Sequence, residues 1–397
     1  MEPRKYRLGE IVDFNKESIS KQDHLLEIKY LDTSNILDNV IYETPSMKLS
    51  DAPSRAQRKV KHLTIIYSTV RPRLKHHGIL HMPPENLIVS TGFATLDIKE
   101  HYEDIIDATY LYLLLTQSSV TEYLGNIADT AVSAYPSINP SDISSLSFIF
   151  PDLTIQRKIA SIWMSYDQKI HLNSAINDNL EAMAKQLYDY WFVQFDFPNE
   201  EGKPYKSSGG AMVWNEKLKR EIPQGWDFCF LESLLTIRNG RDHKHMEDGI
   251  YPVYGSGGEM RKVSEYLYDG ESVLMPRKGS LNNIMYVNEA FWTVDTMFYS
   301  EMKLSNCAKY IYYTIKDIDF TRWDSGTGVP SMTSSTLYSI KLVKPQNETL
   351  KKFDEMISPL FEHMKQISEQ NVVLTKQRDE LLPLLMNGQA SVNYHLS

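Results

Sequence analysis

Asp152, Asp167 and Lys169 come closest to a catalytic set in this sequence. Their order matches the acid–acid–lysine signature of nucleases in which two carboxylates and a lysine converge on one divalent metal ion. Asp167 and Lys169, however, lie two positions apart on a predicted helix, which places them roughly 200° apart around its axis. They cannot converge on one site, so we expect Asp152 to cap the helix and the other two to form an ordinary surface pair.

A second acid-and-histidine cluster lies at residues 242–248 and contains His243 and His245. Two histidines separated by one residue are weak spacing for a zinc site, so we expect a polar loop. The glycine-rich segments 255–258 and 326–328 lack the Lys-Ser/Thr pair of a phosphate-binding loop, and they indicate turns or a close backbone approach to a ligand. The Asn-Pro-Pro-aromatic motif of base methylation is also missing. The sequence therefore predicts no catalytic residue and no metal site in this chain.

Recognition of nucleic acid is the chemistry that the polar residues suit best. The net charge of −9 argues against it, but a net charge can hide segregated patches. Residues 55–77 contain no Asp or Glu and seven cationic side chains, namely Arg55, Arg58, Lys59, Lys61, Arg71, Arg73 and Lys75. We interpret this stretch as a patch that faces phosphate groups. A solvated loop is the alternative.

Two polar loops later in the chain offer side chains of the same kind. The residues expected to contact DNA there are Arg238, Arg241, Arg277, Lys278, Ser280 and Asn282. Arg71 and Arg277 occupy similar, proline-containing segments in the two halves of the chain. Arginine can form bidentate hydrogen bonds with guanine or phosphate, and Lys, Ser and Asn add further contacts. For each single residue, a solvated surface position is the alternative.

The cellular compartment follows from the cysteines and from the apolar runs. The chain has only two cysteines, Cys229 and Cys307, which excludes a disulfide scaffold and fits a reducing cytoplasm. The first ten residues contain no apolar region of a signal peptide. The longest apolar run, near residues 110–115, is too short to span a bilayer, so we expect no membrane partner.

The elements that position these loops occur twice in the chain, as an internal repeat. A length of 397 residues, with 42% hydrophobic and 23% charged residues, favours two or more ordinary folded domains. Three pairs of similar segments follow each other in the same order, namely 110–114 with 310–314, 130–132 with 327–329, and 146–151 with 340–345. Each copy has a mixed, strand-rich globular stretch followed by a long helical stretch.

The two helical stretches are the strongest structural signal. Apolar residues recur at spacings of three, four and seven, which is typical of a coiled-coil seam. The seam residues that we single out are Ile159, Tyr166, Leu180, Leu187, Ile367, Leu374 and Leu381. Asn177 and Asn371 interrupt the two stripes at equivalent positions. They either fix the register inside the seam or lie at its edge in water.

The boundaries follow from capping residues and from composition. Residues 1–151 form a first globular domain, residues 152–196 a first helix, residues 197–346 a linker with a second globular domain, and residues 347–397 a second helix and tail. Gly388 indicates a helix end. Pro359 follows Ser358, which predicts a second helix in two pieces, with Ser358 capping the longer one. We expect an α+β fold in which two long antiparallel helices separate two pseudo-symmetric mixed α/β domains.

Several segments of the chain resemble the specificity subunit of type I restriction–modification enzymes. They are residues 6–13, 151–160, 169–173, 176–184, 190–192, 222–226 and 378–386. The resemblance spans nearly the whole chain and is strongest in the helices. It departs in one place, because Gln156 and Arg157 of the first copy correspond to the usual family motif whereas the second copy has Leu350, Lys351 and Lys352.

The resemblance implies two target recognition domains, each reading one half of a split duplex DNA target, and a helix pair that acts as a ruler between them. It also implies two DNA methyltransferase subunits that grip the helices and, for cleavage, restriction–translocase subunits. S-adenosylmethionine, ATP and magnesium would be held by those partners and not by this chain. Two other readings stay open from the residues alone, a nuclease and a scaffold that binds only proteins.

Overall fold

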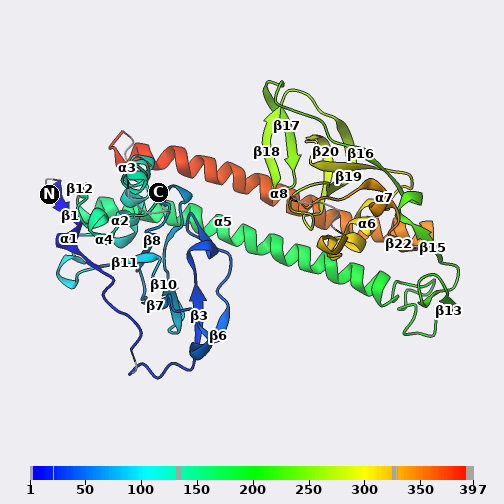
Figure 1. The fold of residues 1–397 in the computed structure, drawn as a ribbon, viewed down its shortest axis with the longest axis horizontal. Coiled ribbons are helices and arrows are strands. Elements are labelled where there is room, and N and C mark those ends of the chain that lie inside the picture. Colours follow the sequence, from blue (N-terminus) through cyan, green and yellow to red (C-terminus); the bar gives the residue numbers. More distant parts are fainter. Residues whose placement is uncertain (1–2, 21, 131–135, 324–327, 329, 390–397) are drawn as a thin grey trace, which may run out of the picture. The chain divides into compact units, whose positions relative to one another are not determined.

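The computed structural model describes residues 3–20, 22–130, 136–323, 328 and 330–389, and the chain divides into two compact units. Unit 1 consists of Met1–Ser174 and Glu369–Ser397, and unit 2 consists of Ala175–Ser368. Two long helices, α5 (Leu153–Tyr188) and α8 (Asn347–Met386), each contribute to both units (Figure 1). The repeat proposed for 130–132 and 327–329 falls largely outside the described residues.

Unit 1 contains two four-stranded sheets, with strand orders β6-β3-β10-β7 and β2-β11-β8-β9. Strands β3 and β10 run parallel, and the other neighbours in these sheets run antiparallel. The strands are β2 (Val12–Phe14), β3 (Glu27–Leu31), β6 (Ser46–Lys48), β7 (Ala56–Lys59), β8 (Ile65–Ser68), β9 (His77–Ile79), β10 (Leu87–Ser90) and β11 (Phe93–Ile98). A small hairpin, β4 (Ile36–Leu37) and β5 (Val40–Ile41), forms a separate two-stranded sheet.

Helices complete unit 1 and join its sheets to the helix pair. They are α1 (Leu8–Ile11), α2 (Ala108–Leu115), α3 (Ser118–Thr130) and α4 (Pro140–Ser144). The Asp107 side chain caps α2 by accepting a hydrogen bond from the backbone N–H of Tyr110 at 2.9 Å. Every residue of α2 after Ala108 is buried, and the same apolar core contains Trp163 of α5 and Leu385 of α8.

Unit 2 is organised around one six-stranded sheet with the order β16-β21-β19-β20-β17-β18. Its strands are β16 (Leu235–Asn239), β17 (Asp248–Gly255), β18 (Gly258–Val263), β19 (Tyr268–Pro276), β20 (Met285–Thr293) and β21 (Met297–Met302). A separate hairpin consists of β13 (Met212–Asn215) and β14 (Arg220–Pro223), and two further helices are α6 (Ala308–Lys316) and α7 (Ser334–Tyr338). An aromatic cluster in the core of this unit joins Phe353 of α8 to Trp191 and Phe192, which lie in the π-helical turn Asp189–Val193 directly after α5.

The internal repeat is confirmed by the pairing of strands. In unit 1, β1 (Arg4–Arg7) pairs antiparallel with β12 (Ser147–Phe150), which directly precedes α5. In unit 2, β15 (Asp227–Phe230) pairs antiparallel with β22 (Lys341–Lys344), which directly precedes α8. The repeated tyrosine-rich segments fall in α2 and α6. Two mixed α/β units and two long helices agree with the α+β fold that was expected.

The ends of the long helices agree with their capping residues. The Asp152 carboxylate accepts a hydrogen bond from the backbone N–H of Thr154 at 2.9 Å, and this bond lowers the pKa of Asp152. At the other end, α8 stops at Met386, and Gly388 adopts a left-handed conformation with φ of 68°.

The predicted division of the second helix at Pro359 is wrong, because α8 is continuous through this residue. Proline removes one hydrogen bond from a helix interior, at a cost of about 3 kcal/mol. Phe353 and Ile357 before the proline and Ile367 after it are buried on one stripe. Burying each such side chain stabilises the helix by about 1.5–3 kcal/mol, so the combined burial outweighs the cost of the proline.

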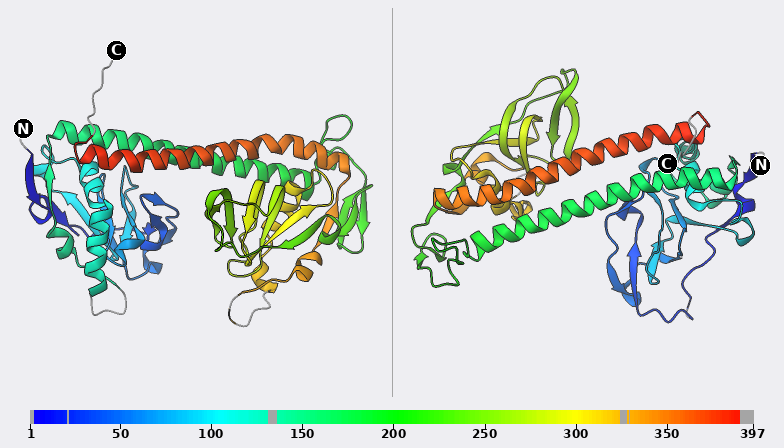
Figure 2. Two further views of the ribbon diagram at one scale, coloured as in Figure 1. Left: turned by 90° about the horizontal axis from the view of Figure 1, so that it is seen from above. Right: turned by 180° about the vertical axis from the view of Figure 1, so that it is seen from behind.

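The two long helices run antiparallel to each other in each unit taken by itself. In unit 1, Asp167 of α5 lies beside Arg378 of α8, and farther along α5 the side chain of Asn173 donates to Asn371 at 2.8 Å. In unit 2, Asn177 of α5 donates to the hydroxyl of Ser368 at 3.0 Å. Figure 2 shows that the strands of each unit lie on one side of its helical segments. No helix in the described part of the chain is long and apolar enough to cross a membrane.

Candidate nucleic-acid interface

The first cationic loop of unit 1 connects β8 and β9 and contains Arg71, Arg73 and Lys75. Arg71 and Lys75 adopt the left-handed backbone conformation, with φ of 48° and 54°, and they flank the short turn Pro72–Leu74. A non-glycine residue loses about 1–2 kcal/mol in this conformation, so contacts around the loop must hold it. The three cationic residues are exposed.

Arg73 is bonded to α3 and not simply extended into solvent. Its guanidinium contacts Glu122 at 3.2 Å, Asn126 at 2.6 Å and Asp129 at 2.5 Å. Hydrogen bonds with Asp129 and Glu122 raise the pKa of Arg73. Gly125 makes room for this side chain, because a Cβ atom there would lie 2.7 Å from the Arg73 Cζ atom. These bonds use three of its five N–H donors and pair its charge with two carboxylates, so the charge of Arg73 is largely balanced inside the fold.

The cations of the preceding strand β7 also have neighbours within unit 1. The Lys59 ammonium lies 2.7 Å from a carboxylate oxygen of Asp23, and their hydrogen bond lowers the pKa of Asp23 to about 2. Arg58 donates to the Ser18 hydroxyl at 3.2 Å and is half-buried. The exposed cations of this stretch are Arg55 and Lys61. The positive charge of residues 55–61 is therefore partly balanced inside the fold.

The corresponding loop of unit 2 connects β19 and β20. The side chain of Asn282 anchors the end of this loop. It donates a hydrogen bond to Asp319 at 3.2 Å and accepts one from the backbone N–H of Phe320 at 2.8 Å. Gly279 has φ of 89°, and a Cβ atom there would lie 2.8 Å from the Ser256 hydroxyl. The glycine-rich turn at 255–258 therefore packs directly against this loop, and the lack of space explains why position 279 is a glycine.

Three further side chains of this loop were predicted to contact DNA. Lys278 and Ser280 are exposed. Arg277 is half-buried, and its guanidinium lies 5.9 Å from the ring centroid of Phe298. The planar guanidinium is thus oriented by an aromatic face at the loop's edge.

Arg238 and Arg241 lie in different surroundings in unit 2. Arg238 forms a bidentate ion pair with Glu301 across the β16–β21 pair, with two distances of 3.1 Å. Arg241 is exposed beyond the end of β16. The adjoining residues 242–248 were expected to be a polar loop, and within the described ranges no cluster of His, Cys, Asp and Glu is arranged to hold a metal ion.

The cationic loops of both units are held by the same kind of pairing, which sequence reasoning missed. The backbone N–H of Arg71 donates to the carbonyl of Pro136 at 2.9 Å, and that of Gly279 donates to Pro330 at 3.0 Å. Isolated β-bridges lie beside these bonds, between Val70 and Ser137 and between Lys278 and Ser331. The repeated Pro-Ser dipeptide at 136–137 and 330–331 was the sequence signal that could have revealed the pairing.

Asp167 was expected on the surface but is buried, whereas Lys169 is exposed. The Asp167 carboxylate accepts a hydrogen bond from the Asn39 side chain at 3.1 Å. It also lies 3.4 Å from His171, and the hydrogen bond between them raises the pKa of His171. The expected surface pair is wrong because the β4–β5 hairpin of unit 1 covers this side of α5.

The predicted seam residues are buried to different degrees, and Ile159 and Leu187 contribute to the cores of units 1 and 2. Ile159 and Ile367 are buried, and the partly buried ones are Tyr166, Leu180, Leu187, Leu374 and Leu381. Asn371 and Asn177 both face the opposite helix, because Asn371 accepts a hydrogen bond from Asn173 and Asn177 donates to Ser368. Polar pairs inside an apolar seam favour one register over alternatives.

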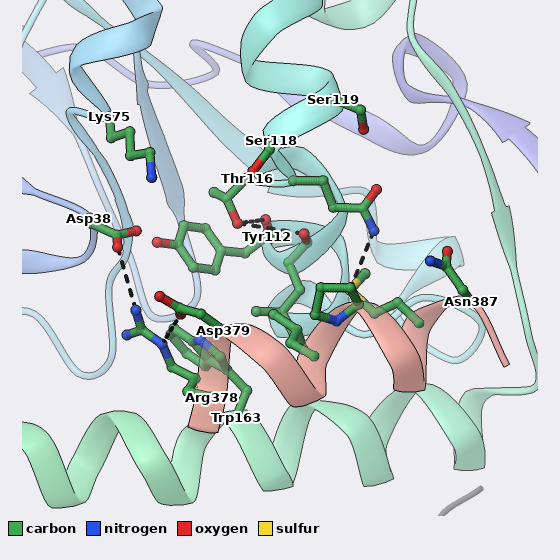
Figure 3. Close-up of a pocket in the computed structure, with 15 residues that line it drawn as sticks. Asp38, Lys75, Tyr112, Thr116, Ser118, Ser119, Trp163, Arg378, Asp379 and Asn387 are labelled. Carbon is green, nitrogen blue, oxygen red and sulfur yellow. Dashed lines mark hydrogen bonds and ion pairs between the residues drawn. The ribbon is translucent and has the colours of Figure 1, made fainter. Parts of the chain in front are cut away.

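A cavity of about 370 Å³ lies in unit 1 between the α2–α3 corner and the helix pair (Figure 3). Tyr112 and Trp163 line its apolar side, and Lys75 of the cationic loop also lines it. The Tyr112 hydroxyl is hydrogen-bonded to Nδ1 of the buried His77 at 3.1 Å. Asp38 and Arg378 face each other across one edge at 3.5 Å.

Comparison with known proteins gives consistent results along the chain. Residues 2–182 and 223–372 match the protein family described as type I restriction modification DNA specificity domain. The type I restriction enzyme HindI specificity subunit of Haemophilus influenzae is 23% identical, over 97% of this chain and 99% of its own length. The MjaIX specificity subunit of Methanocaldococcus jannaschii is 26% identical, over 79% of this chain and 76% of its own length.

The fold is similar to that of a solved structure. The crystal structure of a type I restriction-modification system S subunit from M. genitalium has a TM-score of 0.59 with 17% sequence identity, and the match covers 97% of this chain and 96% of that one. At this identity the similarity concerns the fold alone.

Proposed function

Because the chain belongs to the family of type I restriction modification DNA specificity domains, we propose that it is the DNA sequence-specificity subunit of a type I restriction–modification complex. It binds a bipartite duplex target, and each unit reads one half-site. The observation that carries this proposal is the cationic loop that each unit holds by a bridge to a Pro-Ser segment. Two copies of one recognition arrangement on one chain suit a target of two half-sites.

The exposed cations of these loops and of the segments around β7 and after β16 supply the contacts in this proposal. In unit 1 they are Arg55, Lys61, Arg71 and Lys75, and in unit 2 they are Arg241, Lys278 and the partly exposed Arg277. Contacts with phosphates position the chain on DNA, and contacts with base edges give the sequence preference. Arg73 supports the loop of unit 1 through its ion pairs with α3, and Arg238 joins β16 to β21 through its ion pair with Glu301.

Partner subunits carry the chemistry. Two DNA methyltransferase subunits bind the helix pair, and restriction–translocase subunits join them for cleavage. Exposed apolar side chains on both long helices support such docking, with Leu172 and Val372 in unit 1 and Met183 and Met356 in unit 2. S-adenosylmethionine, ATP and magnesium are bound by these partners, the chain itself is not catalytic, and the complex acts in the cytoplasm.

Methylome sequencing of a host with and without this gene tests the proposal. We expect a split motif with two defined halves to lose its methylation when the gene is deleted. Unchanged methylation would contradict the proposal. For the purified chain, binding to duplex DNA that weakens steeply with salt and prefers one sequence would exclude a scaffold that binds only proteins. Metal-dependent DNA cleavage by the chain alone would instead support a nuclease.

A further inference from the structure

The tip of the β4–β5 hairpin lies against the helix pair in unit 1. Asp38 and Asn39 form its two-residue turn, with φ of 44° and 70°. Positive φ at both central residues is the geometry of a tight hairpin turn, and Asp and Asn tolerate it better than most residues. The chain therefore places two short polar side chains at a rigid tip.

One side of this tip is bonded to both long helices. The Asn39 side-chain amide donates to Asp167 of α5 at 3.1 Å, and Asp38 lies 3.5 Å from the guanidinium of Arg378 of α8. Arg378 also approaches Asp167 at 3.9 Å. The side chains of Asp167 and Arg378 are only 12% and 11% exposed, so the contact between them is weakly screened by solvent, whereas Asp38 is 45% exposed.

The other side of the tip is bonded to the end of the cationic loop. The backbone N–H of Asp38 donates to the carbonyl of Lys75 at 2.8 Å, and that of Asn39 donates to His77 at 2.9 Å. The Asn39 side-chain oxygen accepts from the backbone N–H of Ile79 at 2.9 Å. A Cβ atom at Gly78 would lie 3.0 Å from that oxygen, so the tip and β9 have no room to slide past each other.

We propose that the Asp38–Asn39 turn is a positioning element that fixes the loop at residues 71–75 against the helix pair. Asp167 and Arg378 then determine how unit 1 reads its half-site, although they do not contact DNA. This inference rests on the proposed function. Directional polar bonds specify one orientation, whereas apolar packing of equal size would tolerate several.

Beyond the bridge to a Pro-Ser segment that both units share, unit 2 holds its loop by other contacts than unit 1, so the proposal predicts an effect on one half-site only. Its loop is fixed by Asn282 through Asp319 and Phe320, and by the turn at 255–258. The helix contact at Lys365, which pairs with Glu289 of β20 at 3.0 Å, is a half-exposed ion pair of little energetic weight. Loss of the Asp167 contacts should therefore affect one half-site and not the other.

Asp167→Asn and Asn39→Gly are the informative variants. Asp167→Asn keeps the shape but removes the charge that faces Arg378 and His171. Asn39→Gly keeps the left-handed turn and removes the side-chain bonds to α5 and β9. The matched control is Lys365→Gln, which breaks the helix-to-sheet ion pair of unit 2.

The assay uses the full chain assembled with its methyltransferase subunits, and duplexes that carry the target or single base changes in either half-site. Methylation rates give the discrimination against each change, and exchange of residues 1–151 with those of a related protein identifies the half read by unit 1. We expect Asp167→Asn and Asn39→Gly to lose about tenfold in discrimination within that half, as for the loss of one charge-assisted hydrogen bond. Discrimination in the other half, and in both halves for Lys365→Gln, should stay unchanged.

Two results would overturn the inference, namely variants of unchanged melting temperature that discriminate like the wild type in both halves, or an equal loss in both halves. If Asp167→Asn does not fold, Asn39→Gly alone decides, because its change lies in a turn that glycine suits. A wild-type complex without any sequence discrimination would contradict the proposed function itself.

Discussion

Lys309 of α6 gives the sharpest test of what holds unit 2 to helix α8. Its ammonium lies 2.6 Å from Glu271 and 2.8 Å from Asp354 of α8, and only 4% of the side chain is exposed. It also lies 5.1 Å from the ring centroid of Tyr286. Substitution Lys309→Met keeps most of the apolar stem and removes the charge, which leaves two carboxylates without their cation.

The size of the effect follows from the exposure of those carboxylates. Removal of one partner from a buried ion pair costs about 3–5 kcal/mol, mostly because the remaining charge is left uncompensated. Asp354 is 14% exposed and Glu271 is 28% exposed, so water can reach both in part. We therefore expect the lower end of the range, about 3 kcal/mol of unfolding free energy for unit 2.

Urea unfolding of the full chain, combined with hydrogen exchange of α6 and β19, would measure this loss and assign it to unit 2. The control is Lys351→Met on the same α8, because Lys351 pairs with Glu355 at 3.8 Å and is 65% exposed. That exposed pair should contribute less than ~0.5 kcal/mol. If Lys309→Met destabilises unit 2 no more than the control does, the buried pair does not hold α8 in the way described.

Four further predictions follow from the units and their loops. Exchange of residues 1–151 for those of a related protein should change one half of the methylated motif and leave the other, as methylome sequencing would show; a change in both halves would contradict separate recognition. If Arg71 and Arg277 read bases, Arg71→Ala and Arg277→Ala should each weaken the free energy of specific DNA binding by ~1–3 kcal/mol, as DNA titration would measure. Arg73→Ala should instead lower the stability of unit 1, because the bonds from Arg73 to α3 are lost. Insertion of four residues near Asn177 adds about 6 Å to the helix and should lengthen the spacer of the target by about two base pairs with both half-sites kept. A folded, active variant with an unchanged spacer would show that helix length does not set the distance between the half-sites. Burial lowers the pKa of His77 to about 4, so as the pH falls the unfolded state binds a proton before the folded state does. The unfolding free energy of unit 1 should therefore decrease by up to ~1.4 kcal/mol per pH unit between pH 6.5 and 4. Urea titrations at several pH values should find a smaller decrease in His77→Gln.

Local patterns in the sequence were sufficient to predict the long helices and their ends. The apolar spacing, the cap at Asp152 and the stop at Gly388 depend on residues within a few turns of each other, so the chain shows them directly. Pro359 also acts locally, but the burial that outweighs it comes from Phe353 and Ile357 packing in the core of unit 2. That packing is a tertiary effect, which explains why the predicted break was wrong.

The candidate interface was less predictable because charge in a sequence does not reveal its partner. Arg73 and the acids of α3 are about fifty positions apart, and Asp167 and Asn39 are separated by 128 positions. A cation that is available to bind DNA and a cation that faces an acidic neighbour therefore have the same appearance in residues 55–77. Gln156 illustrates the same limit, because its buried side chain bonds to Ile105 and Asp107 of the loop before α2.

Leu385 has a consequence for the biosynthesis of the chain. It lies in the last turn of α8 but is buried in the core of unit 1, together with Ile159 and Trp163. Unit 2 is one continuous segment, so we expect it to fold once Ala175–Ser368 has left the ribosome. Unit 1 takes part of its core from the end of α8, so we expect its apolar surface to stay incompletely covered until that helix is synthesised. Premature termination before Leu385 would therefore endanger the half that was made first, and a nascent chain at this stage is a natural client for chaperones.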